Sequence, residues 1–164
     1  MKTEAPTASA RLTPKRIYRI LAIAEAITWT GLIVALIAKY AFHVDALMFP
    51  FGLAHGIVFV SYGAMQIVVG LNQRWSAGRI LAGIATAIVP YATIPWERAL
   101  ERRGALDGPW RTEATDDPRD AGAIDRLLRW GLRNPWLLLL IVGASVAVVI
   151  VVLLQLGPPA QWFD

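Results

Sequence analysis

The side chain best placed to do chemistry in this sequence is Glu25, a carboxyl group inside a long apolar stretch. A charged side chain deep in a bilayer costs roughly 2.5–3.5 kcal/mol on insertion scales, so it normally faces the interior of a helical bundle. There it can carry a proton, bind an ion or act as a general base. His55, in the next apolar stretch, is the second candidate for such chemistry.

Polar side chains recur every three or four residues in three apolar stretches, which places them on one face of each expected helix. The three sets are Glu25, Thr28, Leu32 and Lys39; His55, Phe59, Tyr62 and Gln66; and Thr86, Pro90, Thr93 and Glu97. We therefore expect all three faces to turn towards the interior of the bundle, because polar groups exposed to lipid have no partner.

Depth along the helices refines this arrangement. A helix rises about 1.5 Å per residue, and the first two helices run antiparallel. We therefore expect Glu25 to pair with Tyr62 or Gln66, and His55 to lie on the far side of Trp29. Such a network could equally serve only to fix the register of the helices, and a neutral His55 could be satisfied by a backbone carbonyl.

Four apolar stretches must position these groups: Ile20–Lys39, Pro50–Leu71, Ile80–Trp96 and Trp136–Leu156. Each approaches the ~20 residues that a helix needs to cross a ~30 Å hydrocarbon core. The chain is 56% hydrophobic and only 17% charged, beyond the range of ordinary soluble domains. The sequence therefore predicts an all-α, polytopic transmembrane bundle of four spans, the third short and kinked by its prolines.

The rest of the chain divides around these spans. Residues 1–15 are expected to be a disordered tail, 16–103 a three-span membrane core, 104–133 a polar loop with an amphipathic helix, and 134–164 a fourth span with a short tail. Asp117 and Pro118 are typical of a helix start. After them, one face would carry Ile124, Leu127, Leu128 and Gly131, and the opposite face Arg126, Arg129 and Arg133. This pattern favours a helix lying in the membrane interface, with a solvated helix packed on the loop as the alternative.

Several functions lack the residues that they need. The chain has no cysteine, so disulfides and thiolate catalysis are excluded. No phosphate-binding glycine loop or nucleophile motif is present, and His43 with Asp45 is too weak a pattern for a metal site. We expect no enzyme activity, cofactor, metal or nucleic-acid partner.

A row of small residues in the second stretch suggests close helix contacts. Gly52 and Gly56 form a small-xxx-small motif, which Gly63 and Gly70 extend on nearly the same face. The row could be a dimer contact, but close packing within one chain is the favoured interpretation.

The orientation follows from the number of crossings. Four spans place both termini on one side, and the basic residues before the first span favour the cytoplasm. If the third stretch instead re-enters at Pro90 and Pro95, the long loop joins the N-terminal tail in the cytoplasm and the C-terminus ends outside.

Short motifs along residues 16–103 resemble those of a known family. They are Tyr18-Arg19, Glu25 with Trp29, Lys39-Tyr40, His55-Gly56, Arg74-Trp75-Ser76 and Pro95-Trp96-Glu97-Arg98. The chain resembles the domain of unknown function 3817 family of small bacterial integral membrane proteins. The resemblance implies a multi-pass protein of the bacterial plasma membrane with no assigned activity. It draws attention to Glu25, Lys39, His55, Glu97 and Arg98, which match the polar pattern of the family.

These observations favour a non-enzymatic membrane subunit or scaffold with an intramembrane polar network. The candidate site residues are Glu25, Trp29, Lys39, His55, Tyr62, Gln66, Glu97 and Arg98. The alternative is a carrier of a small solute, an ion or a proton that uses Glu25 and His55; an enzyme with either as general base has least support. The expected partners are the lipid bilayer and a second copy or another membrane protein.

Overall fold

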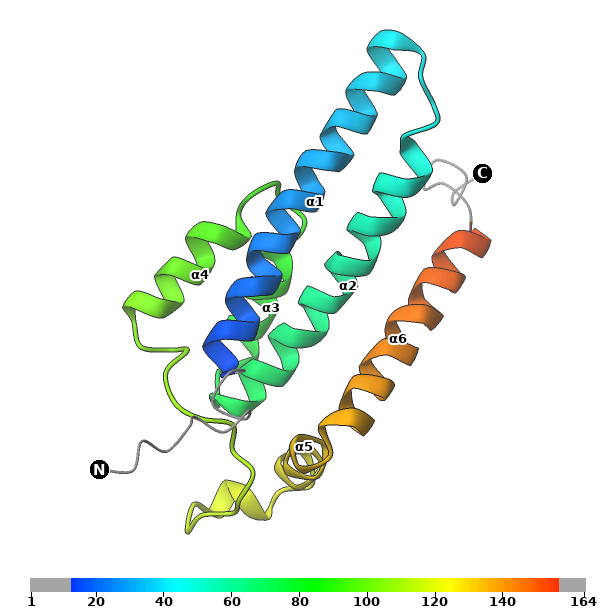
Figure 1. The fold of residues 1–164 in the computed structure, drawn as a ribbon. Coiled ribbons are helices and arrows are strands. Elements are labelled where there is room, and N and C mark those ends of the chain that lie inside the picture. The colour runs from blue at the N-terminus through cyan, green and yellow to red at the C-terminus, as the bar shows by residue number, and fades with distance from the viewer. Residues whose placement is uncertain (1–12, 157–164) are drawn as a thin grey trace, which may run out of the picture.

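The fold of residues 13–156, described by a computed structural model, is all-helical, as predicted (Figure 1). Residues 1–12 of the predicted disordered tail lie outside the described part of the chain, as does the segment after residue 156. The helices are α1 (Pro14–Phe42), α2 (Met48–Asn72), α3 (Ala77–Thr86), α4 (Thr93–Arg102), the short 3₁₀ helix η2 (Pro118–Ala121), α5 (Ala123–Arg133) and α6 (Pro135–Leu156).

Helices α1 and α2 form a long antiparallel pair at the centre of the bundle (Figure 1). Thr13 caps α1 by accepting a hydrogen bond from the Arg16 amide at 3.2 Å, and Pro14 fits the first turn, where its missing N–H leaves no gap. The pair reverses after His43, whose left-handed backbone (φ 56°) ends α1. This pair supplies most of the buried polar side chains.

The third apolar stretch does not form one kinked span, which corrects the sequence prediction. Residues 80–96 are divided between α3 and α4, which lie beside each other and cover only part of the length of α1 and α2 (Figure 1). Pro90 cannot continue a helix, and Tyr91 adopts a positive φ of 65°, so the chain reverses there. At about 1.5 Å per residue, each ten-residue helix is ~15 Å long, half of a ~30 Å core. The two helices form a half-length helical hairpin, which we call the re-entrant hairpin.

Three helices in the described part of the chain are long and apolar enough to cross a bilayer, rather than the four that we expected. They are Pro14–Phe42, Met48–Asn72 and Pro135–Val152. The third of these, within α6, packs mainly on α2 and α5; a Cβ on Gly56 would lie 3.3 Å from Ile150. The favoured role for the small residues of α2, packing within one chain, is confirmed for Gly56.

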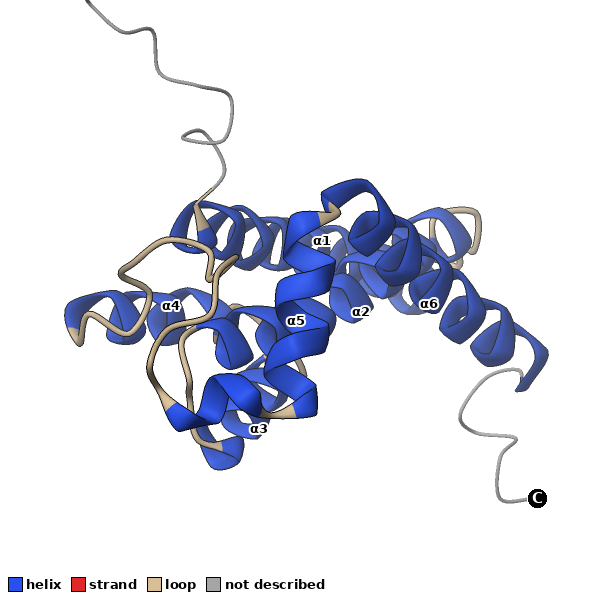
Figure 2. Cartoon of the chain, turned by 90° about the horizontal axis from the view of Figure 1, so that it is seen from below, coloured by secondary structure: helices blue, strands red, loops and turns tan. Residues whose placement is uncertain are grey.

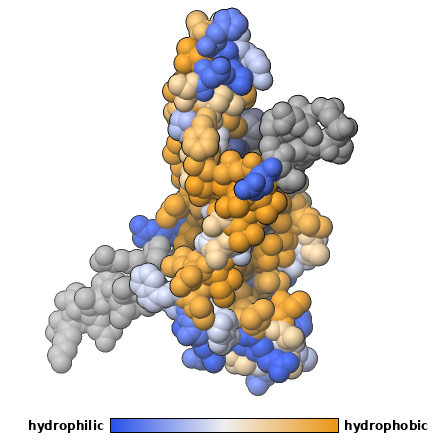
Figure 3. All heavy atoms as spheres, turned by 90° about the vertical axis from the view of Figure 1, so that its right-hand side faces the viewer, coloured by the Kyte–Doolittle hydropathy of each residue, from blue (hydrophilic) through white to orange (hydrophobic). Residues whose placement is uncertain are grey.

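One end of the bundle gathers the polar segments, and we call it the loop end. It comprises the first turns of α1, the last turn of α2 and residues 103–134. Trp75 donates its Nε1–H to the Ala105 carbonyl at 3.0 Å, and Asn72 donates to the Pro109 carbonyl at 3.2 Å. Figure 3 shows hydrophilic residues at the two ends of the molecule and a hydrophobic band between them. The band matches a bilayer core.

Helix α5 lies across the three long helices, as Figures 1 and 2 together show. Asp117 does cap a helix start, but the helix is the 3₁₀ turn η2, and α5 begins only after Gly122. Burial does not follow the two predicted faces of α5: Leu128 and Arg129, from opposite faces, are both buried, whereas Ile124 and Leu127 are 64% and 67% exposed. The face that packs on the protein thus includes an arginine, and part of the apolar face is free.

Candidate functional site

Four polar side chains from three helices form one buried hydrogen-bond network, which we call the tyrosine–glutamine network. Its members are Tyr18 of α1, Tyr62 and Gln66 of α2, and Thr86 of α3. The amide Nε2 of Gln66 donates to the Tyr62 hydroxyl at 2.7 Å and also to the Tyr18 hydroxyl. The Tyr62 hydroxyl lies 3.3 Å from that of Tyr18 and 3.2 Å from Thr86 Oγ1. The network joins both long helices to the re-entrant hairpin.

The local sequence explains why these groups meet. Tyr62 and Gln66 are four residues apart, so they share a face of α2. Gly83 has no side chain, and the Gln66 amide lies against it; a Cβ there would come within 2.6 Å of the amide carbon. The tyrosine rings pack with their centroids 5.8 Å apart. The glycine therefore makes the room in which the network forms.

Glu25 faces the bundle interior, as predicted, and is 0% exposed. The predicted pairing with Tyr62 or Gln66 is not formed as a hydrogen bond, because neither carboxyl oxygen has a partner. Glu25 is nevertheless close enough to interact electrostatically with Tyr62. The side-chain oxygen of Gln66 also lacks a partner, although its nitrogen is fully used. The Glu25 carboxyl group and the Gln66 side-chain oxygen are therefore buried hydrogen-bond acceptors without a donor.

His55 lies beside Trp29, as expected, and away from the tyrosine–glutamine network. The two rings are 4.5 Å apart between centroids, and His55 Nδ1 is 3.2 Å from the Thr28 hydroxyl. Trp29 donates its indole N–H to the Ala87 carbonyl at 3.0 Å, at the end of α3. Trp29 and His55 thus support the tip of the re-entrant hairpin, and the histidine is satisfied by a hydroxyl rather than by a carbonyl.

A row of ion pairs fastens α4 to the start of α1. Arg19 binds Glu97 at 2.9 Å and also binds Glu101, and Lys15 binds Glu101 at 2.9 Å. One turn deeper, Thr93 donates to the Ala22 carbonyl at 3.0 Å. The inward face predicted for residues 86–97 is therefore correct at its threonines and Glu97.

Two predicted site residues lie apart from the buried groups. Lys39 is at the opposite end of α1, where it pairs with Asp45 at 3.2 Å. Arg98 is exposed on α4, next to the ion-paired Glu97. Neither is brought to Glu25 by the fold.

Sequence reasoning missed an arginine cluster at the loop end. Asp120 is 4% exposed and accepts hydrogen bonds from Arg74, Arg111 and Arg129, at 2.8, 3.1 and 3.1 Å. The Thr115 backbone and hydroxyl groups donate to the same carboxyl, and together with the arginines they lower the pKa of Asp120. This Asp120 cluster ties η2 and α5 to the end of α2.

Tyr18 was missed as well, although a signal for it existed. It is seven residues before Glu25, two turns along the same helix face, and it is 1% exposed. Counting aromatic hydroxyls together with charged side chains would have extended the inward face of α1 to include it.

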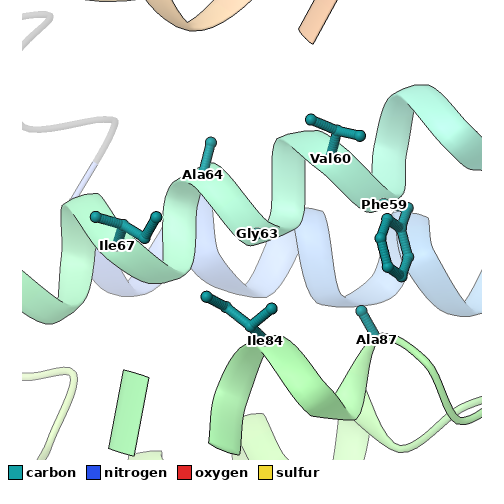
Figure 4. Close-up of a pocket in the computed structure, with 7 residues that line it drawn as sticks. All are labelled: Phe59, Val60, Gly63, Ala64, Ile67, Ile84 and Ala87. Carbon is teal, nitrogen blue, oxygen red and sulfur yellow. The ribbon is translucent and has the colours of Figure 1, made fainter. Parts of the chain in front are cut away.

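The arrangement places Glu25 and His55 in separate surroundings. Neither residue lines either of two hollows on the described surface. The more enclosed of these, about 340 Å³, lies on α2 and is lined by Phe59, Val60, Gly63, Ala64, Ile67, Ile84 and Ala87. In Figure 4, Ile84 and Ala87 extend from the hairpin towards α2, where Gly63 leaves the surface open. All seven residues are apolar, which suits contact with lipid or another helix.

Comparison with known proteins agrees with a membrane protein. The family model described as "Domain of unknown function (DUF3817)" matches residues 15–102. The Streptomyces coelicolor protein named "Putative membrane protein SCO5905" is 32% identical over 122 residues, which cover 73% of this chain and 14% of that protein. The chain therefore spans a small part of the length of this relative. No solved structure matches the chain.

Proposed function

The chain belongs to the domain of unknown function 3817 family, and from that premise we propose that it is a non-enzymatic subunit of a larger assembly in the plasma membrane. The observation that carries the proposal is the match to a relative in which the similar region makes up only 14% of a longer membrane protein. In the relative this region is one part of a much longer membrane protein, and we infer that the same region of this chain likewise associates with other membrane helices.

The fold supports a scaffold role. The tyrosine–glutamine network, the Arg19 ion pairs and the Asp120 cluster hold the re-entrant hairpin, α5 and the long helices together. Polar contacts of this kind fix the register of helices in lipid, where apolar burial does not discriminate between arrangements. A carrier that uses both Glu25 and His55 is less well supported, because His55 is bonded to Thr28 whereas the Glu25 carboxyl group has no partner, and neither residue lines either hollow described above.

The hollow on α2 is the surface that we assign to the partner helix. Its small residues, Gly63 and Ala64, allow another backbone to approach closely. A Cβ on Gly63 would meet nothing within 4 Å, so a larger residue there would fill the hollow without disturbing the chain itself.

Site-specific photocrosslinking tests this assignment in native membranes. A crosslinker at Ala64 should join the chain to one defined membrane protein. The same group at Ile27, which is 64% exposed on α1, serves as the matched control. Gly63→Leu should abolish the Ala64 product while leaving the yield of folded chain unchanged. Equal products from both positions, or a product that survives Gly63→Leu, would refute the assigned surface.

A further inference from the structure

Glu25 has no positively charged neighbour to balance an ionised carboxylate. The nearest cation along α1 is Arg19, about 9 Å away along the axis at ~1.5 Å per residue, and it is already bound to Glu97 and Glu101. His55 is held by the Thr28 hydroxyl. A fully buried charge without a counter-ion is strongly disfavoured, and the group neutralises instead.

The elements that pack against this part of α1 supply no counter-ion for Glu25, although the buried indole N–H of Trp96 on α4 is also left without a partner. From α2 the titratable groups on this side are Tyr62 and His55; from α4 it is Glu97, itself acidic and bound to Arg19. The re-entrant helix α3 contributes the Thr86 hydroxyl, which donates to the Gly83 carbonyl at 2.6 Å. Tyr18, on the same helix as Glu25, receives a hydrogen bond from Gln66.

We propose that Glu25 is an intramembrane proton-binding site, in which the buried carboxyl group carries a proton at neutral pH. The proton neutralises a carboxyl group that is 0% exposed and whose oxygens have no hydrogen-bond donor. The inference concerns this side chain alone and holds whether or not the chain is a subunit.

The packing favours a proton over a metal cation. An alkali or alkaline-earth ion needs several oxygen ligands and a space of its own. Glu25, Gln66 and Ala22 are each 0% exposed, and Tyr18 and Tyr62 are each 1% exposed. The tyrosine hydroxyls are already used within their network. A proton needs neither additional ligands nor a cavity.

Infrared spectroscopy of the intact chain in lipid bilayers tests the proposal directly. At pH 7 the wild-type protein should show the carbonyl stretch of a protonated carboxylic acid, and deuterium exchange should shift it. Glu25→Gln, a neutral side chain of the same shape, should remove that band completely. Glu97→Gln is the matched control: it removes a carboxyl group bound to Arg19 and should leave the band unchanged.

Other outcomes would overturn the proposal. Loss of a carboxylate band in Glu25→Gln would mean that Glu25 is ionised at neutral pH. A thermal stabilisation of the wild-type protein by sodium or potassium chloride, absent with choline chloride and absent in Glu25→Gln, would identify a metal ion instead. Should Glu25→Gln fail to fold, Glu25→Met removes the same carboxyl group, and wild-type protein labelled with ¹³C on its glutamate carboxyls still reports whether the acid band exists.

Discussion

At the scale of single residues, burial determines which side chains of this membrane core can be predicted from sequence. Glu25 had to face inward because lipid gives a carboxyl group no partner, and it does. The hydrogen bonds of its expected partners, Tyr62 and Gln66, were not predictable in the same way. These side chains bond to each other and to Tyr18 instead of Glu25, which the spacing of polar residues does not encode.

Gly83→Ala should destabilise the fold, even though alanine favours a helix by roughly 0.5–1 kcal/mol over glycine. The new methyl group would lie 2.6 Å from Cδ of Gln66, whose amide is held by two tyrosine hydroxyls and cannot swing away. Overpacking of this kind costs about 1–3 kcal/mol, so the net effect is a lower midpoint of thermal unfolding in detergent.

Gly63→Ala is the control for this substitution, because a Cβ at Gly63 meets nothing within 4 Å. It should unfold at the wild-type temperature or slightly above it. Equal stability of the two variants would show that Gly83 is not what accommodates the Gln66 amide.

At the scale of elements, the re-entrant hairpin shows which features of the fold could be predicted from the sequence and which could not. Residues 80–96 are apolar enough to be taken for a span, and Pro90 and Pro95 indicated a break. The reversal itself depends on Tyr91, whose backbone lies in the left-handed region. A tyrosine rarely adopts this conformation, and no local sequence pattern predicts it. The Arg19–Glu97 pair was hidden for the same reason, since a crossing helix would have carried Glu97 to the opposite end of the bundle.

The loop end depends on the Asp120 cluster for its attachment to α2. Asp120→Asn keeps the shape of the side chain but removes the charge that three arginines share. We expect trypsin to cut residues 103–119 several times faster in this variant than in the wild-type protein in bilayers. Asp116→Asn, at an exposed position nearby, should leave the cutting rate unchanged. Equal rates in the two variants would contradict the role of the cluster.

The same cluster gives a prediction about pH. The hydrogen bonds from Thr115 and the charges of Arg74 and Arg129 lower the pKa of Asp120 in the folded state. Its contribution to stability is therefore complete above the ordinary aspartate value of about 3.9 and is lost as the pH falls through the lower folded value. The protection of the backbone amides of residues 103–121 against hydrogen exchange should stay constant from pH 7 to about 4 and fall only in stronger acid. Asp120→Asn should show low protection at every pH. A loss of protection near pH 6 in the wild type would exclude Asp120 as the cause.

At the scale of the whole molecule, the number of crossings decides the orientation. Crossing by the three helices that are long enough would place the two ends of the described chain on opposite sides, which is the outcome expected for re-entry at Pro90 and Pro95 rather than for four crossings. Every lysine and arginine between residues 13 and 156 except Lys39 lies on segments at or next to the loop end. Positive charge beside spans favours the cytoplasm, so the loop end should be cytoplasmic and the connection between α1 and α2 should face outward.

Cysteine labelling can test this orientation cleanly, because the chain has no native thiol. In intact cells, an impermeant maleimide should label Val44→Cys, between α1 and α2, and should label Glu113→Cys only after the membrane is permeabilised. Labelling of Glu113→Cys from outside would reverse the orientation. Labelling of both positions from the same side would contradict the placement of the two connections at opposite ends.

The half-length hairpin also makes the protein unequal in the two leaflets. In a bilayer that the three long helices cross, α1, α2, α6 and both arms of the hairpin would occupy the leaflet next to the loop end, with α5 at its surface. Of the described helices, only the three long ones would continue through the other leaflet. The cross-section therefore tapers from one membrane face to the other. A tapered inclusion displaces more lipid from one leaflet than from its neighbour, so several copies gathered together would bend the bilayer or settle where it is already curved.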